Sequence, residues 1–91
     1  MASLRMVRDL VSIGSTIEIR DLYSNESETY MLVRPNEADI ARNRISSLTP
    51  MGKAVFGRRV GDVVDVNAPG GVFLVRIEAI EHSVGQLARA G

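Results

Sequence analysis

The chain has 91 residues, enough for one small domain, with 45% hydrophobic residues, 24% charged residues and a formal net charge of zero. The balanced charge gives no general basis for binding nucleic acid through its phosphates, so no specific nucleic-acid recognition is expected. The chain has no cysteine and a single histidine, His82, which excludes disulfides, thiolate metal sites and histidine clusters. It also lacks an apolar run of about 18 residues and the apolar core of a signal peptide, so we expect a cytoplasmic protein without membrane partners.

The N-terminal segment, residues 1–10, is the least determined part of the chain. Leu4, Val7 and Leu10 recur at helical spacing, so this segment is either the end of a helix or a tail. We expect its apolar residues to form a terminal patch on the domain rather than a dimer seam. The domain itself is predicted to span residues 11–82.

Two strands joined by a polar turn are predicted over residues 11–33. The first strand follows from the period of two that is typical of a half-buried strand. Its alternating apolar positions are Val11, Ile13, Ile17 and Ile19. The polar residues 23–27 form the turn, and the second strand spans Glu28 to Val33. Pro35 then ends the strand, and residues 37–41 are expected to form a short helical turn.

The central stretch, Arg44 to Asp65, combines a short strand, a capped helical turn, a glycine stop and the start of another strand. Thr49 is the expected N-cap, with Pro50 at the first helical position, where its missing N–H is not needed. Gly57 supplies the left-handed residue that ends such a helix. The apolar face of the helix is predicted to consist of Met51, Ala54 and Val55.

Two further strands are predicted after the helix. Gly61 turns the chain into the β-branched strand 63–66, and residues 67–71 form a turn with strong breakers. The longest strand candidate spans residues 72–82, and residues 83–91 are expected to be a flexible C-terminal tail. The buried face of the last strand is predicted to be Phe73, Val75, Ile77 and Ala79. The whole pattern indicates an α+β domain of four or five antiparallel strands with one short helix.

Charge is distributed unevenly along the chain. Residues 40–61 contain no acidic residue and five basic ones, whereas residues 18–39 contain six acidic residues and two arginines. Either these charges pair across the folded surface, or a basic face steers the protein toward an acidic partner.

No constellation in the sequence predicts catalysis. His82 has no triad partner in a recognisable motif, and we expect it to be an ordinary surface histidine. Glu37 and Asp39 project to different sides of a strand or a helix, so they do not form a carboxylate pair. The glycines lack the following GK[ST] of a phosphate loop. We therefore expect no catalytic residue, no metal, no cofactor and no enzymatic activity of the chain's own.

The order of several short motifs resembles a known family. These motifs are Gly14-Ser15, Tyr30 to Asp39 (YMLVRPNEAD), Ile45-Ser46, Pro50, Gly57, Val60-Gly61-Asp62 and Pro69-Gly70-Gly71. Over residues 11–82 they resemble the C-terminal domain of the Gre transcript-cleavage factors and their shorter relative, the nucleoside diphosphate kinase regulator (Rnk). The resemblance implies an FKBP-like fold that docks on bacterial RNA polymerase near its secondary channel.

The resemblance does not carry an activity over to these 91 residues. Gre factors deliver acidic side chains on the tip of a long helical hairpin, and these residues have no room for that hairpin. The chain is then either a domain cut from a longer protein or a naturally short relative. The FKBP-like fold also suggests prolyl isomerisation, which uses an aromatic-lined pocket. The chain has few aromatic residues, and Phe73 is expected in the core.

The docking function of the family's C-terminal domain is what the resemblance still implies for this chain. In Gre factors an ISxxSP-like loop ahead of the short helix lies at the polymerase contact. Leu48 at its centre is closer to the Rnk pattern, although Rnk members carry a short hairpin of their own. From the residues alone, Thr49-Pro50 is a good helix start whether or not anything binds. The partner-binding residues implied by the resemblance are Ser46, Ser47, Leu48, Thr49, Pro50, Met51, Lys53 and Arg58.

Two functions follow from this sequence. The first is an RNA-polymerase-binding module of a transcription elongation regulator, with Leu48 as an apolar anchor and Lys53 and Arg58 as a basic rim. DNA binding enters only as a family-level association. The second is a stand-alone interaction domain with another partner, in which an exposed edge strand supports a homodimer. We expect a monomer or a weak homodimer.

Overall fold

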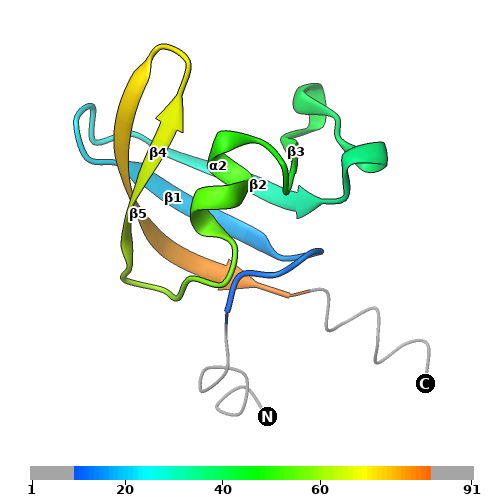
Figure 1. The fold of residues 1–91 in the computed structure, drawn as a ribbon. Coiled ribbons are helices and arrows are strands. Elements are labelled where there is room, and N and C mark those ends of the chain that lie inside the picture. Colours follow the sequence, from blue (N-terminus) through cyan, green and yellow to red (C-terminus); the bar gives the residue numbers. More distant parts are fainter. Residues whose placement is uncertain (1–9, 83–91) are drawn as a thin grey trace, which may run out of the picture.

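The structure of the chain is a computed structural model that describes residues 10–82 (Figure 1). Except for Leu10, the predicted N-terminal segment 1–10 lies outside the described residues, and so does the predicted tail 83–91. No helix among residues 10–82 is long and apolar enough to cross a membrane.

One five-stranded sheet forms the framework, with the strand order β3-β2-β1-β5-β4. Three of its four pairings are antiparallel, as expected, but β3 pairs with β2 in parallel. A parallel neighbour requires a crossover, which residues 34–43 supply through two short 3₁₀ turns. The strands are β1 (Thr16–Asp21), β2 (Ser27–Val33), β3 (Arg44–Ser46), β4 (Val63–Ala68) and β5 (Gly71–Glu81), and the 3₁₀ turns are η1 (Pro35–Glu37) and η2 (Ile40–Arg42).

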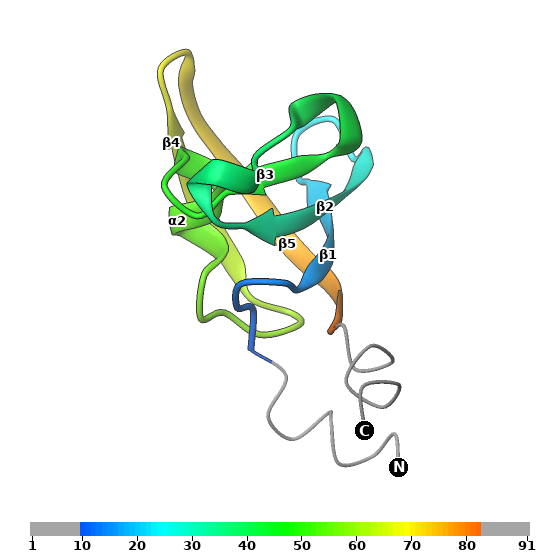
Figure 2. The same cartoon turned by 90° about the vertical axis from the view of Figure 1, so that its right-hand side faces the viewer.

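The helix α2 (Pro50–Val55) has the predicted start and stop. The Thr49 Oγ1 atom accepts a hydrogen bond from the Gly52 N–H at 3.0 Å, and Gly57 has the left-handed φ of 77°. Val55 is buried, and Met51 and Ala54 pack against the core from the same helix. α2 lies over one face of the sheet in both views (Figures 1 and 2).

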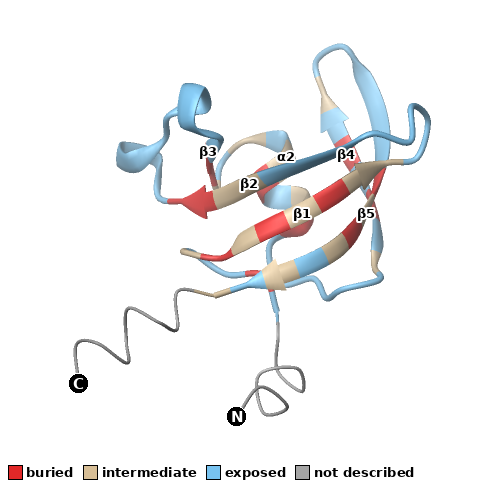
Figure 3. Cartoon of the chain, turned by 180° about the vertical axis from the view of Figure 1, so that it is seen from behind, coloured by how far each residue is buried: buried red, intermediate tan, exposed pale blue. Residues whose placement is uncertain are grey.

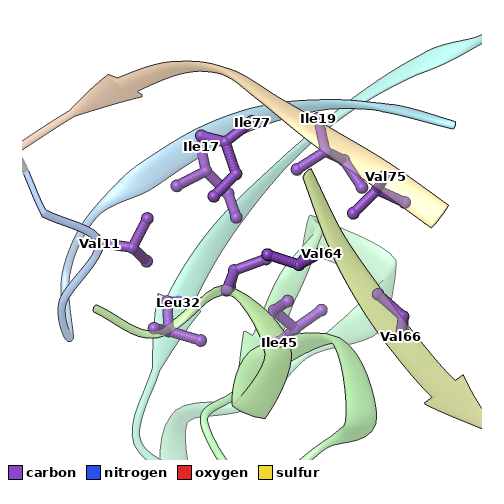
Figure 4. Packing of buried hydrophobic residues seen from close by; sticks show 10 residues of the cluster. Val11, Ile17, Ile19, Leu32, Ile45, Val64, Val66, Val75 and Ile77 are labelled. Carbon is purple, nitrogen blue, oxygen red and sulfur yellow. The ribbon is translucent and has the colours of Figure 1, made fainter. Parts of the chain in front are cut away.

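The core lies between this face and α2. Figure 4 shows side chains from the strands and from the segment before β1 converging there. Along β1 the buried positions alternate, as Figure 3 shows, because successive side chains of a strand point to opposite faces. The buried cluster consists of Val11, Ile17, Ile19, Leu32, Ile45, Val55, Val64, Val66, Val75 and Ile77.

The predicted first strand begins too early. Gly14 has a φ of 94°, which turns the chain, and β1 starts only at Thr16. Val11 still enters the core, because its N–H donates to the Arg58 carbonyl at 2.9 Å and holds this segment against the end of the helix. Ile13, predicted on the buried face, is instead 38% exposed.

The predicted buried face of the last strand is right in its middle and wrong at both ends. Glu18 pairs with Ala79, but Ile19 pairs with Ile77, so Glu78 is an extra residue in β5. This bulge reverses the alternation, and Ile80 rather than Ala79 packs against the core. At the other end Phe73 is 41% exposed, because the β4–β5 hairpin extends beyond the rest of the sheet (Figures 1 and 2).

Candidate partner-docking site

We call Ser46 to Met51 the docking loop, because the family resemblance predicts docking there, and hydrogen bonds to Ser46 fix its conformation. The Ser46 Oγ atom accepts a hydrogen bond from the Leu48 N–H at 2.9 Å, and its carbonyl accepts bonds from the Thr49 N–H and hydroxyl at 3.1 and 2.7 Å. Ser46 is buried, with 7% of its surface exposed. It therefore shapes the loop and offers little surface to a partner, although the sequence grouped it with the contact residues.

Gly52 lets the helix pack closely on this loop. A Cβ atom at Gly52 would overlap the Ser46 carbonyl oxygen and lie 2.9 Å from the Ser47 Cα atom. Only glycine fits without moving one backbone against the other. No sequence pattern predicts this constraint, because it arises from the way the backbone at Ser46 and Ser47 folds against the helix.

The first groove beside the loop lies between α2 and β4 and has a volume of about 420 Å³. Leu48 stands at its edge with 65% of its surface exposed. A residue so exposed is not required for packing, which is what the position of Leu48 before the N-cap predicts. The groove is lined by Leu48, Pro50, Lys53, Ala54, Asp65 and Asn67.

A second groove of about 410 Å³ also borders Lys53 and is lined by Ile13, Ser47 and Phe56 as well. Phe56 is 53% exposed and directly follows the last residue of α2. Neither Phe56 nor Ile13 was predicted at the site. An aromatic residue next to the helix stop was visible in the sequence, whereas the exposure of Ile13 depends on the turn at Gly14.

The predicted residues are only partly brought together. Ser47, Leu48, Pro50 and Lys53 line one groove or the other, while Thr49 serves as the helix cap. Met51 lies half-buried on the core side of α2. Arg58 lines neither groove, since it follows the far end of a helix that is about 9 Å long.

The first groove combines apolar surface with the cation Lys53 and the carboxylate Asp65, whereas Lys53 is the charged residue that borders the second. Lys53 lies on the exposed side of α2 and takes part in none of the ion pairs found within residues 10–82. The arrangement suits an apolar contact with a polar rim, which is the usual anatomy of a protein interface.

Among the described residues, the lining of these two grooves includes no histidine and one carboxylate, Asp65. Over residues 10–82 no three His, Cys, Asp or Glu side chains are placed to hold a metal ion. His82 is half-buried and its Nδ1 atom lies 3.0 Å from the Ser15 Oγ atom, so the prediction of an ordinary surface histidine is wrong. Ser15 is fully buried, and its Oγ atom accepts the Ser12 N–H at 2.9 Å, so this pair anchors the chain before β1.

Comparison with known proteins gives a consistent family. The profile described as "Transcription elongation factor, GreA/GreB, C-term" matches residues 6–82. The chain is 44% identical over 73 residues to the transcription elongation factor GreA of Geobacillus kaustophilus, covering 80% of the chain and 46% of that relative. It is 46% identical over 63 residues to GreA of Rhodospirillum rubrum, covering 69% and 40%. The chain thus spans about half the length of the curated relatives it matches.

Solved structures agree in fold. Thermus aquaticus Gfh1 matches with a TM-score of 0.73 and 38% identity over 82% of this chain and 49% of that chain. The elongation factor GreA/GreB from Nitrosomonas europaea matches with a TM-score of 0.68 and 34% identity, covering 82% and 63%. The small α+β architecture predicted from the sequence is confirmed.

Proposed function

The chain belongs to the GreA/GreB C-terminal domain family of transcription elongation factors, and on that premise we propose that it is a module that binds bacterial RNA polymerase. The proposed contact is the rim of the secondary channel, which is the location implied by the family resemblance. The docking loop and the two grooves beside it form the binding surface, with Leu48 as its apolar anchor.

The observation that carries this proposal is the exposure of Leu48 on a rigid loop. The hydrogen bonds that hold the loop include two to the Ser46 carbonyl, one to the Ser46 hydroxyl, one from the Gly52 N–H to the Thr49 hydroxyl, and one from the Ser47 N–H to the Val33 carbonyl. A preorganised apolar side chain loses little conformational entropy on binding, so its burial by a partner is converted efficiently into affinity. Lys53 beside it supplies a cation at the rim.

A binding assay with full-length GreA as competitor tests the function. We expect the labelled chain to bind bacterial core RNA polymerase saturably, and full-length GreA to displace it. Binding without displacement would place the chain at another surface of the polymerase, and absence of binding would contradict the proposal.

The second candidate function, an interaction domain that forms a homodimer, is favoured by one observation. β4 is at the end of the sheet, and Val63 on this edge strand is 52% exposed. An uncovered edge strand offers unpaired backbone groups to a second strand. Sedimentation equilibrium checks this candidate, because the edge pairing predicts a dimer whose population rises with protein concentration.

A further inference from the structure

A third groove lies on the face of the sheet that α2 covers, next to the first turn of that helix. We call it the acidic groove: it is bounded by Tyr30, Met51 and Phe73 and rimmed by Asp21, Glu26 and Glu28. Ile19 and Val75, both nearly inaccessible, form its floor. It shares no residue with the two grooves at Leu48 and Lys53, and only Met51 with the predicted partner-binding residues.

The groove is open because α2 is too short to cover the sheet. Six helical residues span about 9 Å, whereas the eleven residues of β5 extend over about 36 Å. Beyond Met51 the apolar side chains of this face are therefore left uncovered. Phe73 is 41% exposed and Tyr30 is half-buried at this place.

The carboxylates at the rim lack cationic partners among the described residues. None of the ion pairs within residues 10–82 includes Asp21, Glu26 or Glu28. Asp21 accepts the Tyr23 and Ser24 N–H groups at 2.8 and 3.2 Å and so holds the β1–β2 turn. Glu26 and Glu28 remain to interact with a ligand. The pKa of Tyr30 is raised, mainly by burial and further by the nearby Glu28 carboxylate, as expected beside an anionic rim.

The size and chemistry of the groove suit one long cationic side chain. Its volume of about 140 Å³ is below the roughly 300–1,000 Å³ of pockets that hold a whole small molecule. Arginine and lysine place an aliphatic stem on apolar surface while the charged head reaches acceptors at the edge. The faces of Tyr30 and Phe73 can add cation–π attraction to the same head group.

We propose that the acidic groove binds a single arginine or lysine side chain presented by a partner protein. The apolar floor contacts the stem, and Glu26 and Glu28 pair with the charge. This proposal does not depend on polymerase docking, because its groove shares only Met51 with the docking loop and its charged contact is made by Glu26 and Glu28.

A titration of the full 91-residue chain followed by NMR tests the proposal. The probe is a blocked Leu-Arg-Leu peptide, and its control carries citrulline, the neutral isostere of arginine. We expect the arginine peptide to shift the signals of Tyr30, Met51 and Phe73, and the citrulline peptide to bind about tenfold more weakly. No shift at millimolar peptide, equal affinity of the two peptides, or shifts confined to residues outside the groove would overturn the proposal.

Matched charge variants locate the contact. The double variant Glu26→Gln/Glu28→Gln should weaken binding of the arginine peptide about tenfold, while the control Glu37→Gln/Glu81→Gln removes the same charge from exposed positions outside the groove and should leave the affinity unchanged. Equal losses in both variants would mean that only the net charge matters, and would overturn the site.

The remaining alternative is that the groove takes an arginine of the same chain from outside the described residues, namely Arg5, Arg8 or Arg89. The variant Arg5→Gln/Arg8→Gln/Arg89→Gln tests this in the full chain. We expect its groove signals and its peptide affinity to match those of the wild type. Groove signals that move in this variant before any peptide is added, with a rise in peptide affinity, would overturn a partner protein as the occupant.

Discussion

Leu48 is the residue whose exposure carries the docking proposal, and its replacement tests it most directly. Because 65% of its surface is exposed, Leu48→Asp should leave folding nearly intact. Loss of an apolar anchor should weaken polymerase binding by about 2 kcal/mol, roughly thirtyfold. The dissociation constant and the melting temperature, measured on the same preparation, check both expectations.

Ile40→Asp is the matched control for this substitution. Ile40 is 72% exposed on η2, so Ile40→Asp introduces the same charge at an apolar surface position outside the docking loop. We expect its polymerase affinity to stay within about twofold of the wild type. If Leu48→Asp folds and binds as well as this control, the docking surface lies elsewhere.

The raised pKa of Tyr30 predicts how the stability of the domain depends on pH in the alkaline range. Burial first, and then the Glu28 carboxylate, raise its pKa above the ordinary value of 10.0, so the folded state holds the phenol proton more tightly than the unfolded state. The resulting contribution to stability is complete below the unfolded pKa and is lost as the pH rises through the folded pKa. Wild type should therefore lose stability above pH 10 more steeply than Tyr30→Phe, in urea unfolding measured at several pH values.

Tyr23 provides the comparison for that experiment. It is 82% exposed, and Tyr23→Phe should follow the wild-type curve throughout the alkaline range. Parallel curves for Tyr30→Phe and wild type would show that the environment of Tyr30 does not favour the neutral phenol.

At the scale of the elements, β5 holds the domain together, and Ile77 is its most deeply placed residue. Its side chain is fully buried, its N–H donates to the Asp62 carbonyl at 2.9 Å, and its carbonyl accepts the Gly61 N–H at 2.7 Å. Ile77→Ala should lower the free energy of unfolding by about 2–5 kcal/mol, through lost burial and the cavity left behind. In a chain of this size that approaches the whole stability.

Urea unfolding measures this effect, with Val72→Ala as the control on the same strand. Val72 is 56% exposed, and its truncation should change the free energy of unfolding by about 0.5 kcal/mol or less. Equal effects of the two substitutions would contradict the assignment of the buried face of β5.

For the whole molecule, the prediction concerns transcript cleavage. No helical hairpin lies within residues 10–82, the part of the chain that the structure describes, so we expect this chain, added alone to stalled elongation complexes, not to stimulate cleavage of the nascent RNA. In excess it should reduce the cleavage stimulated by full-length GreA, because both are proposed to bind the same site on the polymerase. Cleavage stimulated by the chain alone would refute the first expectation, and unchanged GreA activity at saturating chain would refute the second.

The structure agrees with the sequence at most features whose determining atoms are close along the chain, with the turn at Gly14 as the exception. The start of α2 needs only Thr49 to cap the Gly52 N–H and Pro50 to occupy the first turn, and its end needs only Gly57 in the left-handed region. The alternation of β1 and the breakers around residues 67–71 are equally local. The position of the loop ahead of α2 is local in the same way, whereas its role in docking is a prediction from the family resemblance.

Tertiary structure alone decided the features that depend on partners distant in the chain. The parallel pairing of β3, the bulge at Glu78 and the exposure of Phe73 follow from how the strands meet and how little of the sheet α2 covers. The grooves have the same origin, because each joins residues from segments far apart in the sequence, as Leu48 meets Asp65 in the first of them. Periodicity within one strand carries no information about the length of the helix that packs on it, so the sequence by itself determined the elements and the family, while packing determined which surfaces remain open.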